Sequence, residues 1–312
     1  KIYGGAAETG FRRNRVLVPY FKPFHFRNVV QDFIMKRKLG ILSLLLLMPF
    51  FSNACMKLAL TTMPDFVPNM TKAFFEECDL ELAEQSLPSE LKLLEGLLKN
   101  APEDKQLLSA LCMGFTGYAM LFVEEKDEQR ASDLYLRARA YGLKALGVKD
   151  STPEAVPDRL QSMNSGDMEP LFWVTMAWNL WINLNLDKPA AMGQMHASQE
   201  CLKKVMALNP DYFHGSPCIL MGSMLAARPQ MLGGDPVKAK EYFDKAISLS
   251  HGRFFLAQYN YARYYAVRVQ DKELFLSLIE EVEKAPADGM KETCLINSAI
   301  KKKMRTLKEE MD

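Results

Sequence analysis

The stretch Gly233-Gly234-Asp235 has residue types that could hold a phosphate group, because glycines that open a helix can present free backbone amides to an anion. The neighbouring residues argue against this chemistry. Pro236 has no amide hydrogen, and the carboxylate of Asp235 occupies the positive end of the helix dipole, where a phosphate would bind. The sequence therefore predicts a helix with Asp235 as its N-cap and no phosphate site.

Residues that could ligate a metal or act as nucleophiles are scattered along the sequence. His196, His214 and His251 lie far apart and form no HExxH motif, and the cysteines form no CxxC pair. Charged residues make up 25% of the chain, so any Ser-His-Asp set or carboxylate pair drawn from them would be an arbitrary choice. We therefore expect no enzymatic activity, no catalytic residue, no metal site and no cofactor.

The chain contains six cysteines, five of them after Cys55. An odd number without regular spacing does not predict a disulfide framework. We expect these five thiols to be buried as small apolar groups, although an exported protein could form one disulfide among them.

The segment before Cys55 has the composition of an export signal. Met35 is followed by a basic run, a 13-residue apolar stretch and then small residues. Thirteen residues are too few to cross a bilayer core, which needs about 20. We interpret 35–54 as a signal peptide and expect the upstream segment 1–34 to be absent from the mature protein.

A cysteine directly after such a signal resembles the acylated first residue of a bacterial lipoprotein. Ser52 stands where leucine is usual and Asn53 is also unusual, so the pattern resembles a relaxed lipobox. The alternative is ordinary cleavage after Ala54, which leaves the thiol of Cys55 free. Acyl chains on Cys55 would anchor a single domain, residues 55–312, to the periplasmic side of the bacterial inner membrane without spanning it.

The charge balance changes when the leader is removed. Residues 1–54 hold 9 of the 39 basic and 2 of the 38 acidic residues, which leaves 30 and 36 and a net charge of −6. A mildly acidic domain is a poor partner for nucleic acid, because binding depends on neutralising phosphates. We expect no nucleic acid among the partners.

After Cys55, breaks containing proline alternate with stretches of helical period, and no segment alternates apolar and polar residues as a strand would. In the clearest helix, Ala239, Phe243 and Ala246 share an apolar face. The expected helices cover 89–99, 104–124, 128–146, 169–186, 190–208, 216–227, 236–249, 254–269, 272–284 and 289–311.

Three of these helices repeat a pattern of a small residue, a large one four positions later and a small one after three more, which is typical of the second helix of tetratricopeptide repeats. The three sets are Ala131-Tyr135-Ala138, Ser198-Leu202-Val205 and Ala239-Phe243-Ala246. We predict an all-α domain of helical hairpins stacked as a divergent tetratricopeptide-like solenoid, with a plain helical bundle as the alternative.

Residues 209–267 resemble the T component of TRAP (tripartite ATP-independent periplasmic) transporters. The shared features are a turn led by Asp and Pro, Gly222 on the next helix, Pro229 followed by Gly233-Gly234-Asp235, and a helix with the run Ala-Arg-Tyr-Tyr. The resemblance implies an exported, often lipidated, all-helical and non-enzymatic protein. It also implies association with a periplasmic solute-binding protein and a TRAP permease.

Two functions follow as hypotheses. In the first, the chain docks a periplasmic solute-binding protein and helps to pass an apolar ligand toward the permease. In the second, it is a periplasmic tetratricopeptide-like adaptor for other protein partners. The resemblance also suggests a ring, so we expect a homo-oligomer, with a trimer as the favoured state.

Residues 171–186 contain all three tryptophans and are apolar almost all round, which places this helix in a core, at a subunit contact or against a ligand cleft. The helix 216–227 is also apolar on more than one face. Candidate ligand or interface residues are Phe172, Trp173, Trp178, Trp181, Met221, Met224 and Tyr259.

Overall fold

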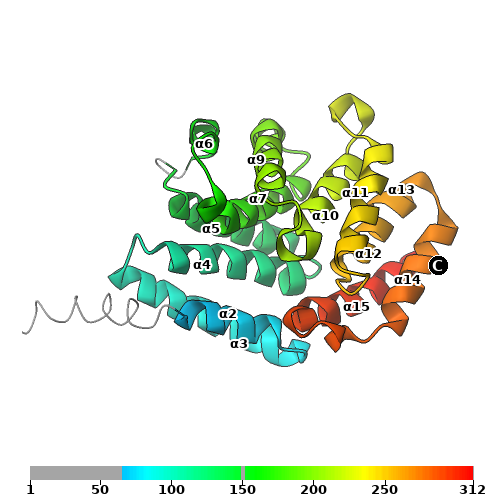
Figure 1. The fold of residues 1–312 in the computed structure, drawn as a ribbon, viewed down its shortest axis with the longest axis horizontal. Helices are drawn as coiled ribbons and strands as arrows, with labels where there is room; N and C mark the ends of the chain where they lie inside the picture. Colours follow the sequence, from blue (N-terminus) through cyan, green and yellow to red (C-terminus); the bar gives the residue numbers. More distant parts are fainter. Residues whose placement is uncertain (1–64, 149–151, 312) are drawn as a thin grey trace, which may run out of the picture. The chain divides into compact units, whose positions relative to one another are not determined.

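The computed structural model describes residues 65–148 and 152–311. The chain divides into two units at Cys55, and all described residues belong to the second, Met56–Asp312. These residues are helical and contain no strand, which confirms the all-α prediction (Figure 1). The predictions for 1–34, for the signal peptide and for Cys55 lie outside the described residues.

The described part of the chain folds into α-helices linked by short turns. In chain order the α-helices are α2 (Phe66–Phe75), α3 (Leu80–Asn100), α4 (Lys105–Tyr118), α5 (Glu128–Ala145), α6 (Val156–Leu160), α7 (Met168–Asn183), α8 (Pro189–Met192), α9 (Met195–Leu208), α10 (Tyr212–Ala227), α11 (Pro236–Leu249), α12 (Leu256–Asn260), α13 (Val267–Val269), α14 (Lys272–Lys284) and α15 (Cys294–Glu309). Two π-helical segments, η1 (Ala119–Val123) and η6 (Tyr261–Ala266), continue α4 and α12. The 3₁₀ turns are η3 (Pro153–Ala155), η4 (Ser165–Asp167), η5 (Gln230–Leu232), η7 (Ala287–Gly289) and η8 (Lys291–Thr293).

Aspartates begin many of these helices by accepting a backbone N–H of the first turn, which would otherwise lack a partner. Asp79, Asp104, Asp127, Asp235 and Asp271 cap α3, α4, α5, α11 and α14 in this way. The bond from Lys238 N to Asp235 Oδ1 measures 3.1 Å, which confirms the predicted N-cap.

The turn before α11 is tightly built. Gly233 has φ of +86°, a conformation that favours glycine. A Cβ on Gly234 would lie 1.9 Å from the carbonyl oxygen of Arg228, so only glycine fits this approach. The amide of Asp235 donates to Leu225 O at 3.0 Å, so the turn folds back onto the end of α10.

Several predicted helices differ from those observed. The predicted helix 89–99 extends back to Leu80, because α3 continues through Pro88. The helix predicted over 190–208 is divided into α8 and α9. The stretch 254–269 is interrupted by η6, whose wider turns follow no simple sequence rule. The short helix α2 was not predicted at all.

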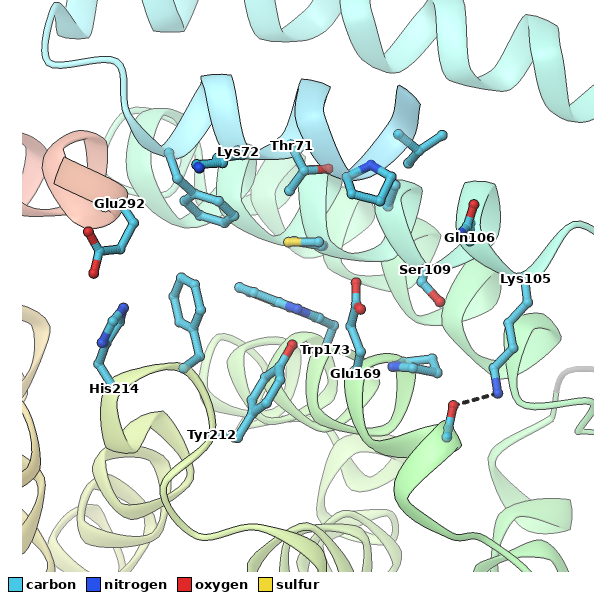
Figure 2. Close-up of a pocket in the computed structure, with 18 residues that line it drawn as sticks. Thr71, Lys72, Lys105, Gln106, Ser109, Glu169, Trp173, Tyr212, His214 and Glu292 are labelled. Carbon is cyan, nitrogen blue, oxygen red and sulfur yellow. Dashed lines mark hydrogen bonds between the residues drawn. The ribbon is translucent and has the colours of Figure 1, made fainter. Parts of the chain in front are cut away.

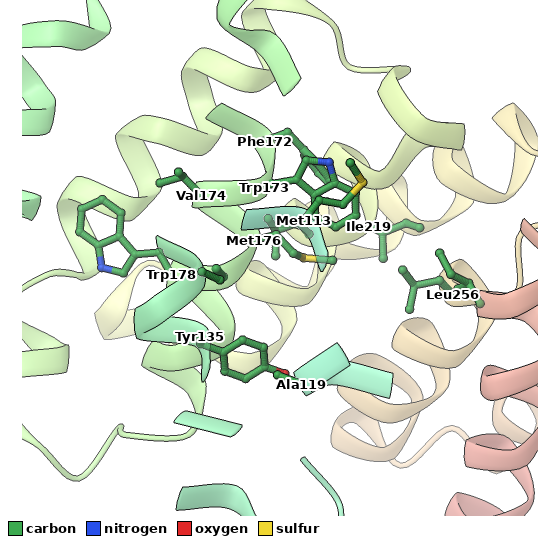
Figure 3. Packing of buried hydrophobic residues seen from close by; sticks show 14 of the residues in the cluster. Met113, Ala119, Tyr135, Phe172, Trp173, Val174, Met176, Trp178, Ile219 and Leu256 are labelled. Atoms are coloured by element: carbon green, nitrogen blue, oxygen red, sulfur yellow. The ribbon is translucent and has the colours of Figure 1, made fainter. Parts of the chain in front are cut away.

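The core forms where α5 packs between α4 and α7, and where α10 packs on α11. Tyr135, Phe172 and Trp178 are among the largest side chains that are fully buried (Figure 3). Gly142 permits the close crossing of α5 with its neighbours, since a Cβ there would lie 2.1 Å from Val174 Cγ2. The core is therefore built mainly by helices that are close to one another along the chain.

The last helix returns to the first ones. α15 packs against α2 and α3, and η8 packs against α2. An open solenoid makes contacts only between neighbouring repeats, so these contacts go beyond that arrangement. A disulfide between Cys78 and Cys294, 216 positions apart, joins the two ends covalently.

The cysteine prediction is correct in part. Cys112, Cys201 and Cys218 are buried free thiols, as expected. Cys78 and Cys294 are not buried thiols; they form the one disulfide that was left open as the alternative, because the return of α15 to α2 brings these distant residues together.

One described helical stretch, Lys105–Val123, has the length and mean hydropathy (1.5) of a membrane span, but 72% of it is buried within the fold. This burial is expected of a central core helix.

Candidate ligand-binding site

A cavity of about 530 Å³ lies between α2, α4, α7, the start of α10 and η8 (Figure 2). Its volume is in the range of small-molecule sites. The lining residues are Val67, Pro68, Thr71, Lys72, Phe75, Lys105, Gln106, Ser109, Ala110, Met113, Gly166, Glu169, Pro170, Trp173, Tyr212, Phe213, His214 and Glu292.

The first turn of α10 supplies one wall of the cavity in an unusual conformation. Phe213, His214 and Gly215 are all left-handed, with φ of 43°, 59° and 81°. Two consecutive non-glycine residues in this region store backbone strain on the order of 1–3 kcal/mol each, and such strain clusters at functional sites. The turn places Phe213 and His214 on the cavity wall. Burial lowers the pKa of His214, an effect that Glu292 opposes, so the site favours the uncharged imidazole.

Aromatic rings from three helices meet around Phe213. Its ring centroid lies 5.2 Å from that of Phe75, 5.8 Å from that of Trp173 and 6.3 Å from that of Tyr212. Burial raises the pKa of Tyr212, and the nearby carboxylate of Glu169 raises it further. These rings form a continuous aromatic wall.

A carboxylate lies beside this wall. Glu169 lies four positions before Trp173, and therefore on the same face of α7. Its side chain is accessible within the cavity, yet the surrounding protein excludes enough water to raise its pKa, an effect that Lys105 opposes. Glu169 makes no hydrogen bond or ion pair with any residue that the structure describes.

The two lysines that line the cavity are engaged elsewhere. Lys105 Nζ lies 2.7 Å from Asp167 Oδ1 and donates to Gly166 O at 2.8 Å. Lys72 Nζ lies 3.8 Å from the carboxylate of Glu76, and its side chain is largely exposed. Each lysine thus has its nearest carboxylate outside the cavity lining.

Other polar groups of the wall have no partner within residues 65–148 and 152–311. The hydroxyls of Thr71 and Ser109 form no hydrogen bond, and the indole N–H of Trp173 is buried without an acceptor. Tyr212 lies near enough for this indole to influence its pKa, but the geometry is not that of a hydrogen bond. An unpaired buried donor costs about 1–3 kcal/mol.

Of the candidate residues from the sequence, only Trp173 lines this cavity. Phe172 and Trp178 are fully buried, and Trp181 packs beside the guanidinium of Arg139. Met221 and Met224 are buried in α10. The hydroxyl of Tyr259 accepts a hydrogen bond from Arg263 at 2.9 Å.

The motif residues around the turn have structural positions. Gly222 lets α10 approach α11, because a Cβ there would lie 3.1 Å from the ring of Phe243. Pro229, Gly233 and Gly234 build the turn that precedes Asp235. None of these residues lines the cavity.

Sequence reasoning missed most of the site. Nothing in the sequence distinguishes Glu169 from the many other acidic residues, and α2 was not predicted. Only Gly215 signals the left-handed turn, since glycine favours that region. Among the described residues, no group of three or more His, Cys, Asp or Glu side chains could hold a metal ion.

Comparison with known families decides what kind of protein this helical fold represents. The family model described as TRAP transporter T-component matches residues 76–312, which include α3 to α15 and most of the cavity wall. The chain belongs to this family. T-components are membrane-associated accessories of TRAP transporters and not a known class of enzyme.

The T-component also has a relative in Treponema pallidum (strain Nichols), a protein described as uncharacterized. The two are 29% identical over 199 residues, which cover 56% of this chain and 62% of the relative. The matched region thus spans less than two thirds of that protein.

Proposed function

We propose that this T-component is a non-enzymatic lipoprotein, residues 55–312, anchored through Cys55 in the periplasm. It docks a periplasmic solute-binding protein and helps to pass a largely apolar ligand toward the TRAP permease. Family membership supports the accessory role. The main support for ligand binding is the cavity, with its aromatic wall and unpaired polar groups.

The disulfide supports export. Disulfides persist in oxidising compartments such as the periplasm and are rare in the cytosol. Cys78 and Cys294 form one in this chain, which agrees with the signal peptide inferred for 35–54. The tetratricopeptide-like stacking of the hairpins and a trimeric state stay predictions.

Docking and assembly can be tested in one experiment. The exported chain with Cys55→Ser, which lacks the proposed acylation site, is mixed at micromolar concentration with the solute-binding protein encoded beside the permease of the same genome. Size-exclusion chromatography with light scattering then measures the masses. We expect a trimer of the chain alone and a heavier complex with the solute-binding protein.

A solute-binding protein from an unrelated transporter is the control and should elute separately. A chain that elutes as a monomer would contradict the trimer. Separate elution of the cognate solute-binding protein would contradict docking, and would leave the adaptor for other proteins as the remaining hypothesis.

A further inference from the structure

Two carboxylates, Glu169 and Glu292, line the cavity; burial raises the pKa of Glu169, and Lys105 lowers it only at longer range, without an ion pair. Each of the cavity's lysines pairs with a carboxylate outside the cavity lining, and burial lowers the pKa of His214, which favours the uncharged imidazole. Glu169 and Glu292 form no ion pair in the described part of the chain. A ligand with an anionic group would therefore meet repulsion, whereas a cation would find a carboxylate without a partner.

The aromatic wall beside this carboxylate is suited to a cation as well. Phe75, Trp173, Tyr212 and Phe213 all line the cavity, and their rings lie close to one another. Aromatic faces attract organic ammonium groups through their quadrupoles, and several rings around one site make an aromatic cage. Figure 2 shows the carboxylate of Glu169 directed into the same space as Trp173 and Tyr212.

We propose that this cavity binds an organic ammonium group on an apolar body, with Glu169 as its counter-ion and the aromatic wall around it. The proposal rests on the ligand-binding role given above and specifies the chemistry of the ligand. The strained turn at Phe213 and His214 is then the element that presents part of the wall. An ammonium beside Glu169 favours the charged form of this carboxyl group.

A second, smaller pocket next to the cavity could hold the apolar part of the ligand. This pocket of about 60 Å³ between α2, α3 and α4 shares Thr71, Phe75, Ala110 and Met113 with the cavity. Apart from Glu90, whose pKa is raised by burial, the rest of its lining is apolar and includes Leu87, Leu91 and Leu94. The two pockets therefore adjoin, and we expect the alkyl part of the ligand to lie along this apolar wall beneath α2.

Three probes with the same alkyl chain length and different head groups separate the effect of charge on affinity from the effect of burying the alkyl chain. Octyltrimethylammonium, octanoate and octan-1-ol are titrated into the exported Cys55→Ser chain, with isothermal calorimetry as the readout. We expect the ammonium to bind at least about tenfold more tightly than octanoate, since one desolvated cation–π contact and one ion pair contribute at least 1.4 kcal/mol.

The variant Glu169→Gln keeps the shape of the side chain and removes its charge. It should weaken ammonium binding by about tenfold or more and leave octan-1-ol binding unchanged. The control Glu281→Gln removes the same charge from the exposed face of α14, outside the cavity, and should leave the affinity for all three probes unchanged. Thermal unfolding of each variant verifies that it is folded.

The outcomes separate the two proposals. If octan-1-ol binds but octanoate binds as tightly as the ammonium, the ammonium proposal is wrong while the ligand site stands. The same conclusion holds if Glu169→Gln leaves the affinity for ammonium unchanged. If none of the three probes binds, both the ammonium proposal and the ligand role of the cavity are contradicted.

Discussion

Replacing both Cys78 and Cys294 with serine should lower the free energy of unfolding by about 4–5 kcal/mol, because the bridge closes a very long loop and so restricts the unfolded chain. The two residues are 216 positions apart. The loss should appear in urea denaturation as a lower midpoint. In a domain of this size it corresponds to a fall in Tm on the order of 10 °C.

A reductant provides the control for this variant. It should lower the Tm of the wild-type protein and leave that of the double variant unchanged, because the variant has no bridge to lose. Equal stability of wild type and variant under oxidising conditions would contradict the prediction.

The bridge also positions one wall of the cavity. Val67 is the only buried residue of α2, so packing alone holds this helix weakly. The disulfide at Cys78 and the ion pair of Lys291 with Glu76, at 3.0 Å, fasten its C-terminal end to the segment around η8. The disulfide therefore contributes both to the stability of the protein and to the position of α2 at the cavity.

The second large effect is expected at Trp178. Trp178→Ala should cost about 3–5 kcal/mol in the free energy of unfolding, the range for truncating a buried tryptophan. Its side chain is fully buried, and Nε1 donates to Gln194 Oε1 at 2.9 Å. The guanidinium of Arg139 lies 5.3 Å from the ring centroid, so the substitution also removes a cation–π contact.

Trp178→Phe is the matched control, because it keeps an aromatic ring and most of the apolar volume but loses the N–H that donates to Gln194. Its loss of stability should be clearly smaller than that of Trp178→Ala. Both proteins are compared by urea denaturation. A change for Trp178→Ala within about 0.5 kcal/mol, the range of surface substitutions, would contradict the placement of this residue in the core.

Local signals explain which parts of the fold could be predicted. The bounds of α11 and α14 agree with the sequence prediction, since each begins with an aspartate cap and carries one apolar face. α5 was predicted to within one residue for the same reasons. These features depend only on residues inside each helix or next to it.

The site depended on information that no local pattern carries. Phe213 and His214 adopt left-handed conformations that are uncommon for non-glycine residues, for phenylalanine above all, so packing around them decides the backbone. The pairing of Cys78 with Cys294 follows from the return of α15 to α2. Trp173 was recognised because tryptophan on an apolar helix is conspicuous, whereas Glu169 becomes distinctive only once its lack of a partner is visible.

The central claim is that the cavity between α2, α4, α7 and α10 is the ligand site of this T-component. A crystal structure of the exported Cys55→Ser chain with saturating octyltrimethylammonium tests it most directly. We predict density for the ammonium between the carboxylate of Glu169 and the rings of Trp173 and Phe213, with the alkyl chain along the apolar wall. An empty cavity, or a probe bound only elsewhere on the protein, would contradict the claim.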